Sequence, residues 1–381
     1  MRIEVYSPTI RRKEMDAVLT AMVEDKIGPG EQAKFLIQTA RERIRFDYCL
    51  ALRSPAIALY LALKSLALDP KLRTEASPLP DRGQGVIISA LSPLYYKLVI
   101  EEMGLIPVYC DTLSSTACMG RETVEKALSY KPEGLVIRCI VLRHTLGYLS
   151  DAASIAEMGI PVIEDCSQSY GTQAGPSGKG EGEEASVQNA ISCGSIVSAG
   201  KAGMFTILGL EERDMLTCGG GALLYSADRR DAAGIRNLGD MPPEYGLPDM
   251  NAALAVVQFR EAAKNLAKRR EIARLYTQSA LRTRHKRFIQ NDILNQPVEY
   301  NNYAFPLILE TGMKDVKAYA RRKEIAVESA FENTLVGSGV VSPEQCPEAY
   351  SLSLRTILFP LYPRLGMADA ERVAKLILTL P

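Results

Sequence analysis

Short apolar runs separated by helical or loop stretches constrain the fold of this chain more than any other sequence feature. The runs cover residues 86–91 (VIISAL), 106–111 (IPVYCD), 134–142 (GLVIRCIVL) and 160–165 (IPVIED). Short, nearly continuous apolar runs are typical of strands buried on both faces of a sheet. Their alternation with helical stretches predicts an α/β protein with a mostly parallel sheet and crossover helices.

The length of 381 residues exceeds what a single hydrophobic core usually supports, so we expect a large domain and a smaller one. A long amphipathic helix is predicted from Leu247 to about Ala280. We expect the large domain to cover residues 1–240 and the small domain, with this linking helix, to cover residues 241–381. Residues 173–186 are rich in Gly, Ser and Glu, which predicts a surface loop.

Composition narrows the class of partner. The formal net charge is zero and the sequence pI is about 6.8, so we expect neither nucleic acid nor an anionic membrane as a partner. The chain also has no apolar run long enough to span a membrane, which predicts a cytoplasmic protein. Its 8 cysteines lack metal-ligand spacing, so we expect reduced thiols in the core and no metal site.

Several segments, taken in order, resemble the DegT/DnrJ/StrS-type sugar aminotransferases, which are fold-type-I enzymes dependent on pyridoxal phosphate (PLP). The segments that carry the resemblance are LRSPAIALYLALKSLAL (52–68), RHTLGYLSD (143–151), VIEDCSQSYG (162–171), GGGALLYS (219–226), LPDMNAALAVVQF (247–259) and ILFPLYPRLGMADAERV (357–373). The resemblance implies a large domain with a mostly parallel seven-stranded sheet flanked by helices and a smaller C-terminal α+β domain. It also implies a homodimer that acts on sugar nucleotides.

The resemblance assigns roles to three residues near strand ends. Asp165 falls where the family binds the pyridine nitrogen of PLP, Gln168 falls near the ring, and His144 falls at the rim of the active site. Each also has a structural alternative from the residues alone. Asp165 can cap the next helix, and a lone histidine after an apolar strand is more often structural than catalytic.

The phosphate pocket of the family is altered in this chain. Its Gly-Thr pair at a helix N-terminus is replaced by Pro55-Ala56 after Ser54, and proline has no N–H to offer a phosphate. Alternatively, Pro55 simply starts the helix. The partner-subunit asparagine of the family aligns with Glu244, whose carboxylate would repel a phosphate.

The Schiff-base lysine of the family has no equivalent here. The family reads Phe-Ser at Phe205-Thr206, and counting forward from this pair places Glu211 at the lysine position. Counting back from the later glycines places Glu212 or Arg213 there. None of the three side chains can form an imine.

Other residues do not replace this lysine. Lys179 and Lys201 lie upstream in contexts that do not match, and His285 is predicted to lie in an exposed basic loop. The ring that stacks on PLP in the family aligns with Pro93, although Tyr95 and Tyr96 are close enough to substitute for it. For these tyrosines, ordinary helix packing is the alternative.

These substitutions predict that PLP, the cofactor of the family, is not covalently bound and is no longer held. The leading hypothesis is a non-transaminating homologue that binds a sugar nucleotide or a protein partner. A second hypothesis is an active enzyme that uses PLP or pyridoxamine phosphate (PMP) with a relocated base, such as Glu211, Glu212 or His144. A third is a regulatory or scaffolding subunit that pairs with an active paralogue through Glu244.

Overall fold

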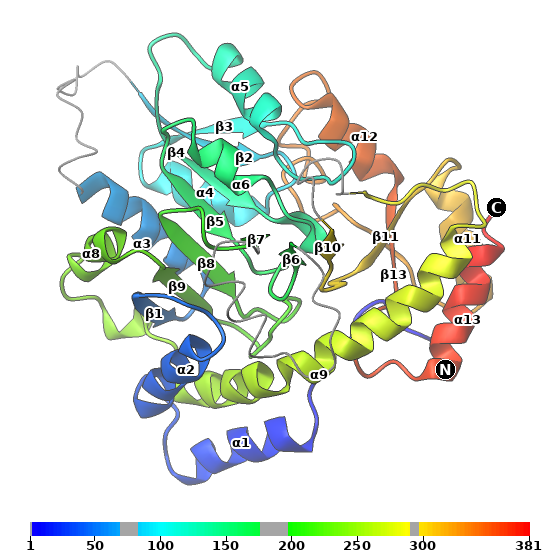
Figure 1. Cartoon of the computed structure of the whole chain (residues 1–381), viewed down its shortest axis with the longest axis horizontal. Helices are drawn as coiled ribbons and strands as arrows, with labels where there is room; N and C mark the ends of the chain where they lie inside the picture. Colours follow the sequence, from blue (N-terminus) through cyan, green and yellow to red (C-terminus); the bar gives the residue numbers. More distant parts are fainter. Residues whose placement is uncertain (1, 69–82, 176–196, 290–296) are drawn as a thin grey trace.

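The computed structural model describes residues 2–68, 83–175, 197–289 and 297–381 (Figure 1). A seven-stranded sheet forms the centre of the large domain, in the order β1-β9-β8-β5-β4-β2-β3. Its neighbouring strands run parallel except for β9, which is antiparallel to both β1 and β8. The mostly parallel sheet predicted from the sequence is therefore confirmed. The strands are β1 (Tyr48–Leu52), β2 (Gln84–Ser89), β3 (Ile106–Cys110), β4 (Val136–Arg143), β5 (Val162–Asp165), β8 (Phe205–Gly209) and β9 (Ala222–Ser226).

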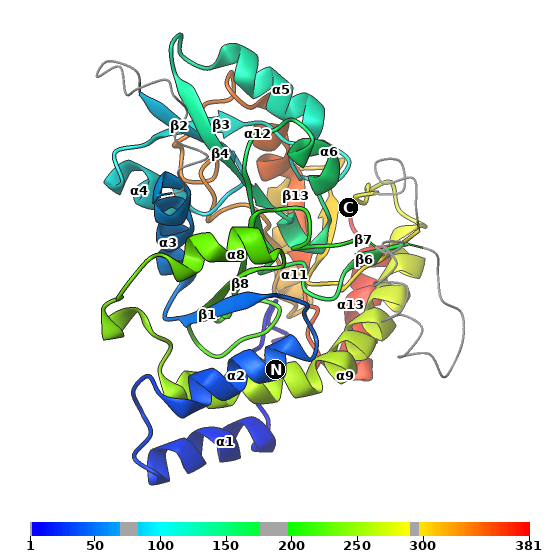
Figure 2. The ribbon, with the colours of Figure 1, turned by 60° about the vertical axis from the view of Figure 1, so that its left-hand side comes forward.

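Helices cover both faces of this sheet (Figures 1 and 2). One face packs on α3 (Pro55–Leu68) and α4 (Leu94–Glu102) through a buried apolar cluster. The other face packs on α5 (Arg121–Tyr130), α6 (Ala152–Ala156), α2 (Glu31–Arg41) and the first half of α9 (Asp249–Ala280). The apolar residues of each strand alternate between the two faces, which explains why the strands read as continuous apolar runs.

The small domain contains an antiparallel sheet, β11-β13-β12, packed against helices. Its strands are β11 (Phe305–Ile308), β12 (Glu328–Ser329) and β13 (Thr356–Phe359), and its helices are α11 (Met313–Arg322) and α13 (Met367–Leu378). The long helix expected from the sequence is α9, which begins at Asp249 after Pro248. Its second half enters the small-domain core through Ile272 and Tyr276, so α9 joins both cores.

The remaining elements lie at the edges of the two domains. They are α1 (Arg12–Val23), α8 (Arg229–Arg236), α12 (Pro347–Arg355), the 3-10 turns η1 (Thr145–Gly147) and η2 (Pro243–Tyr245), and a sheet of β6 (Gln173–Ala174), β7 (Val197–Ser198) and β10 (Val298–Glu299). The predicted surface loop thus begins with a short strand, and its residues 176–186, like Lys179 and Cys193, lie outside the described part. Among the residues described, no helix combines the length and apolarity needed to cross a membrane.

Contacts cross the expected domain boundary at residue 240, a division that stays a prediction. Ile3 forms a bridge with Ile325 and belongs to the small-domain core. Conversely, Phe331 and Leu352 belong to the core of the large domain. Each domain core therefore contains residues from both sides of residue 240.

The basic loop predicted around His285 is exposed at Arg282, Arg284 and Lys286, but the prediction is wrong for His285 itself, which is buried. His285 is only 7% exposed, and its Nδ1 atom accepts a hydrogen bond from the backbone N–H of Glu310. Its neighbour Lys286 exchanges backbone hydrogen bonds with Ile308 at the end of β11. This pairing holds the basic segment against the small-domain sheet, a contact that the local charge pattern does not reveal.

Candidate functional site

Asp165 lies at the carboxyl end of β5, where ligands gather in parallel sheets. It is 1% exposed, and both of its carboxylate oxygens accept hydrogen bonds from the chain itself. Its Oδ1 atom accepts from the N–H of Ser167 at 2.9 Å and from the Ser167 hydroxyl. Its Oδ2 atom accepts from the Tyr96 hydroxyl and from Arg143 Nη1 at 3.4 Å. The carboxylate therefore has donors on both oxygens without any ligand.

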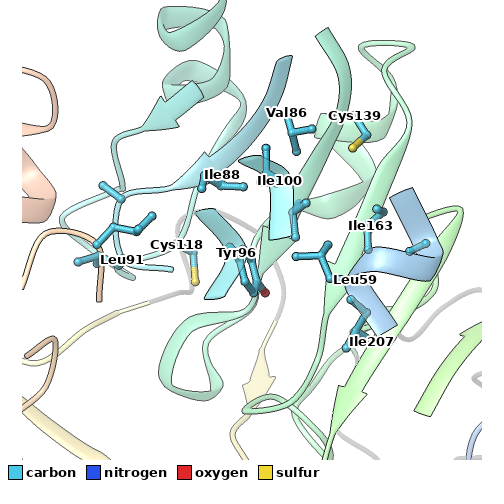
Figure 3. Packing of buried hydrophobic residues seen from close by; sticks show 14 of the residues in the cluster. Leu59, Val86, Ile88, Leu91, Tyr96, Ile100, Cys118, Cys139, Ile163 and Ile207 are labelled. Atoms are coloured by element: carbon cyan, nitrogen blue, oxygen red, sulfur yellow. The ribbon is translucent and has the colours of Figure 1, made fainter. Parts of the chain in front are cut away.

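Tyr96 reaches Asp165 from α4, whose first turn follows Pro93. The Tyr96 side chain is fully buried within the apolar cluster of the large domain (Figure 3). Burial, together with the negative charge of Asp165, raises the pKa of Tyr96 well above its usual range, so the hydroxyl remains a neutral donor. The partly buried Tyr95 packs edge-on against the Tyr96 ring, with centroids 4.9 Å apart. In this arrangement the two tyrosines pack on each other and on the core.

Arg143 is the last residue of β4 and lies opposite Asp165 in the parallel register. Its side chain is 13% exposed. Burial alone would lower the pKa of Arg143, but the attraction of Asp165 outweighs it, so the guanidinium stays charged. A permanent cation thus lies beside the carboxylate that the resemblance assigns to the pyridine nitrogen.

None of the three residues predicted at the lysine position forms a hydrogen bond or ion pair with Asp165, whose partners are Tyr96, Arg143 and Ser167. Glu212 and Arg213 are exposed, and Arg213 pairs with Glu328 of β12 at 2.7 Å. Glu211 is partly buried, and burial raises its pKa. Thr206 lies on the opposite face of the sheet, where its hydroxyl donates to the Gly200 carbonyl oxygen at 3.3 Å.

Asp214 is the functional candidate that the sequence reasoning missed. Its Oδ2 atom accepts a hydrogen bond from the N–H of Glu211 at 2.9 Å. Burial, with the nearby Asp165 charge, raises its pKa to about 8, although Arg143 opposes this effect. A Cβ atom on Gly209 would lie 2.3 Å from Asp214 Oδ2 and 2.7 Å from Ser167 Oγ, so a larger residue would displace one of these side chains.

The sequence around the end of β8 carries no local signal that marks Asp214. The strand extends through Gly209, beyond the Phe205-Thr206 pair from which the lysine position was counted. Asp214 lies five residues beyond this strand end, lines the cleft, and is near enough to Asp165 for that charge to raise its pKa.

Gln168 lines the cleft described below and also stabilises the loop after β4. Its Oε1 atom accepts a hydrogen bond from the N–H of Leu146 at 2.7 Å, and its side chain also hydrogen-bonds Tyr303. Leu146 has a φ of 53°, which is costly for a residue other than glycine. Gln168 thus stabilises a strained turn and connects it to the small domain.

Asn301, from the small-domain side, stabilises the segment around Gln168 through hydrogen bonds. It is fully buried, and its Nδ2 atom donates to the carbonyl oxygens of Gln168 at 2.7 Å and Tyr170 at 3.0 Å. Its Oδ1 atom accepts from the N–H of Tyr303 at 2.9 Å. These bonds fix Tyr303 relative to the end of β5.

His144 lies after β4, as expected, but its side chain bonds to Glu164 rather than facing the cleft. Its Nδ1 atom accepts from the N–H of Ser150 at 3.0 Å, so Nε2 carries the proton that it donates to Glu164 at 2.8 Å. Burial alone would raise the pKa of Glu164, but the bonds from His144 and from the N–H groups of Gly200 and Gly203 lower it. His144, Glu164 and Cys166 have possible metal ligand atoms within 4.8 Å of one another, yet these bonds already use the His144 and Glu164 atoms.

The expected phosphate-pocket residues lie apart from this network. Ser54 Oγ accepts a hydrogen bond from the N–H of Ile57 at 3.3 Å, which caps the first turn of α3. Pro55 is buried as the first residue of that helix, and Ala56 is partly buried. Glu244 is exposed in η2.

A cleft of about 540 Å³ lies between the two domains, and Arg143, the ion-pair partner of Asp165, lines it. The large domain contributes Arg143, Gln168 and Asp214, and the small domain contributes Tyr303 and residues 328–334. Among the described residues that line this cleft there is no lysine. The cleft combines fixed cations, a carboxyl group with a pKa near neutrality and several hydrogen-bonding side chains.

Comparison with known proteins identifies the family. The family model described as the DegT/DnrJ/EryC1/StrS aminotransferase family matches residues 8–378. The chain belongs to this family. Its members are PLP-dependent enzymes of fold type I that serve amino-sugar biosynthesis.

Individual relatives are distant in sequence. GDP-perosamine synthase of Escherichia coli O157:H7 is 23% identical over 282 residues, which cover 72% of this chain and 70% of that protein. dTDP-4-dehydro-2,3,6-trideoxy-D-glucose 4-aminotransferase of Saccharopolyspora spinosa is also 23% identical, with 98% of this chain and 95% of that protein covered.

Solved structures of the family share the fold. The aminotransferase TlmJ of Streptoalloteichus hindustanus superimposes with a TM-score of 0.78 at 18% identity, over 98% of this chain and 97% of that chain. PseC of Helicobacter pylori, an aminotransferase in pseudoaminic acid biosynthesis, gives a TM-score of 0.77 at 14% identity, over 99% of this chain and 98% of that chain. The predicted fold-type-I architecture is therefore confirmed.

Proposed function

We propose that this chain is a non-transaminating member of the family, linked to amino-sugar or polysaccharide biosynthesis, and that its cleft binds a sugar nucleotide. One observation carries the proposal: the Oδ2 atom of Asp165 accepts hydrogen bonds from Tyr96 and Arg143. In PLP enzymes a carboxylate at this position must face the pyridine nitrogen, which keeps the ring protonated. Here Tyr96 and Arg143 donate to this carboxylate in place of a pyridine nitrogen.

The residues around Asp165 do not fit PLP. The charged Arg143 guanidinium would repel a protonated pyridine ring. Asp214 faces the cleft from the segment where the family has its lysine, and a carboxyl group cannot form an imine. The sequence contains no lysine between Lys201 and Lys264 that could replace it. Ser54 and Pro55 also offer little to a phosphate, since the serine already caps its own helix.

A sugar nucleotide suits the cleft for two reasons. Curated relatives act, by their names, on GDP- and dTDP-linked sugars. The cleft also presents cations for a diphosphate at Arg143 and Arg213, and amides for sugar hydroxyls at Gln168 and Asn333. In this proposal Asp165 and Tyr96 hold Arg143 in place, and Gln168 fixes the loop that borders the ligand.

The proposal is tested with the purified full chain, PLP and L-glutamate. We expect no formation of PMP or 2-oxoglutarate, and we expect saturable calorimetric binding of dTDP-glucose or GDP-mannose that weakens at least tenfold in Arg143→Leu. Arg322→Leu, at the end of α11 and outside the cleft lining, is the matched control. Formation of PMP would contradict the proposal and favour an active enzyme with a relocated base. Because PLP also reacts with accessible surface lysines, a reducible adduct alone does not decide the question.

We also propose that the protein is a cytoplasmic homodimer. Apolar side chains recur at helical spacing along α1, where Met15, Leu19, Met22 and Val23 are 51%, 56%, 50% and 84% exposed. Because the formal net charge is zero, two copies have no net electrostatic repulsion. The described cysteines are free and buried, which supports a reducing compartment.

A further inference from the structure

A second hollow lies away from the cleft. It borders the sheet face that packs on α2 and α9, two helices that Figure 1 shows side by side. It has a volume of about 430 Å³, which is within the range of small-molecule sites. Its walls come from the end of α2, the middle of α9 and the turn at Lys201. We call it the basic hollow, because it is lined by Arg41, Arg43, Arg45, Lys201 and Arg270, against the carboxylates of Glu42 and Glu299.

Three of the five cations of the basic hollow have no side-chain partner in the described chain. Arg270 pairs with Glu299 at 2.7 Å, and Arg41 lies over the Phe46 ring at 5.2 Å. By contrast, the side chains of Lys201, Arg43 and Arg45 form no hydrogen bond or ion pair with any residue in the described ranges. Their charges remain available to an anion.

Like charges also approach one another in this hollow. Partial burial, and then repulsion by Arg45, lowers the pKa of Lys201. Burial likewise lowers the pKa of Arg270, with Arg274 adding to the effect and Glu299 opposing it. Repulsion between neighbouring cations costs free energy unless an anion lies between them.

The floor of the hollow is apolar. Phe259 and Leu266 of α9 line it, together with Leu208 of β8, and Tyr170 packs edge-on against Phe259 with centroids 5.7 Å apart. A fully hydrated inorganic ion would gain nothing from these side chains. A ligand with both an anionic group and an apolar group would contact both parts of the wall.

We propose that the basic hollow binds a small phosphorylated molecule, with its phosphate between Lys201 and Arg45 and its apolar part against Phe259 and Leu266. The phosphate would accept charge-assisted hydrogen bonds from both cations. This site is independent of the cleft and of the proposed function, because the cleft is lined by none of these residues.

Pyridoxal phosphate serves as the probe, because it is both a phosphate and an aldehyde. Its aldehyde condenses with the Lys201 amine to an imine with loss of one water, and added borohydride reduces the imine to a stable secondary amine. We expect peptide mass spectrometry to find Lys201 labelled ahead of the other lysines, since its pKa is lowered. We also expect inorganic pyrophosphate to reduce this labelling at least fivefold.

Variants separate the hollow from the cleft. In Arg45→Ala, labelling of Lys201 should lose its protection by pyrophosphate, and in Arg45→Ala/Lys201→Ala the calorimetric affinity for pyrophosphate should fall at least tenfold. Lys323→Ala, an exposed lysine elsewhere, and Arg143→Leu in the cleft should leave both results unchanged. Absence of saturable pyrophosphate binding would overturn the proposal. An unchanged affinity in the double variant would overturn it equally.

Discussion

The Tyr96 hydroxyl donates a hydrogen bond to the Oδ2 atom of Asp165, from a helix 69 residues earlier in the chain. Arg143 donates to the same oxygen at 3.4 Å. A carboxylate that a family member would present to a cofactor ring is thus part of an internal network. Both donors come from elements that the sheet brings together, since α4 follows β2 and Arg143 ends β4.

Tyr96→Phe should destabilise the protein, because it removes a donor from a buried carboxylate while keeping the ring. We expect a loss of about 1–3 kcal/mol in the free energy of unfolding, measured by urea denaturation at pH 7. Tyr130→Phe is the matched control, since Tyr130 is 79% exposed. Equal stability of the two variants would mean that the hydrogen bond contributes nothing.

Asp214→Asn should change how stability depends on pH. The folded pKa of Asp214, about 8, lies above its ordinary value of 3.8, so the folded state keeps a proton that the unfolded state loses. The stability that this proton provides is complete below pH 3.8 and is lost as the pH rises toward about 8.

The asparagine cannot ionise and should remove this loss. We expect the variant to lose at least about 1 kcal/mol less stability than the wild type between pH 5 and pH 8, measured by denaturation at several pH values. The exposed Asp240→Asn should keep the wild-type slope. Parallel curves for the wild type and Asp214→Asn would show that Asp214 is ionised at neutral pH.

Asn301→Ala should weaken the junction between the domains. Asn301 is fully buried and makes side-chain hydrogen bonds to Gln168, Tyr170 and Tyr303, so the variant leaves several backbone groups without a partner. We expect a loss of about 2–4 kcal/mol and faster amide hydrogen exchange around residue 303. The exposed Asn333→Ala should change neither.

Leu19→Asp/Met22→Asp should convert the proposed dimer to a monomer. Both side chains are at least half exposed on α1, and carboxylates there would oppose burial between two copies. Light scattering after gel filtration measures the change. Leu354→Asp is the control, because Leu354 is 57% exposed on a different helix. A wild-type protein that is monomeric, or a double variant that remains dimeric, would contradict the role of α1.

The strand pattern predicted the fold because each run is apolar on both faces, a requirement that a parallel sheet imposes locally. The four predicted runs became β2, β3, β4 and β5, and the predicted helix became α9. The sequence also placed Asp165 at a strand end, as found. The charged neighbours of His285 predicted an exposed side chain, but His285 is buried because its segment pairs with the end of β11.

Local sequence patterns could not predict which side chains line the cleft and contact Asp165. Asp214 lines the cleft near Asp165, which counting forward from the Phe205-Thr206 pair does not predict. Which side chain reaches a neighbour depends on the register between strands and on the distance between elements, and these are fixed only when the chain packs. The sequence by itself determined the family, the element order and the absence of a lysine between Lys201 and Lys264. Only the tertiary structure decided that Tyr96 and Arg143 both bind Asp165, because their contacts with it join residues far apart in the chain.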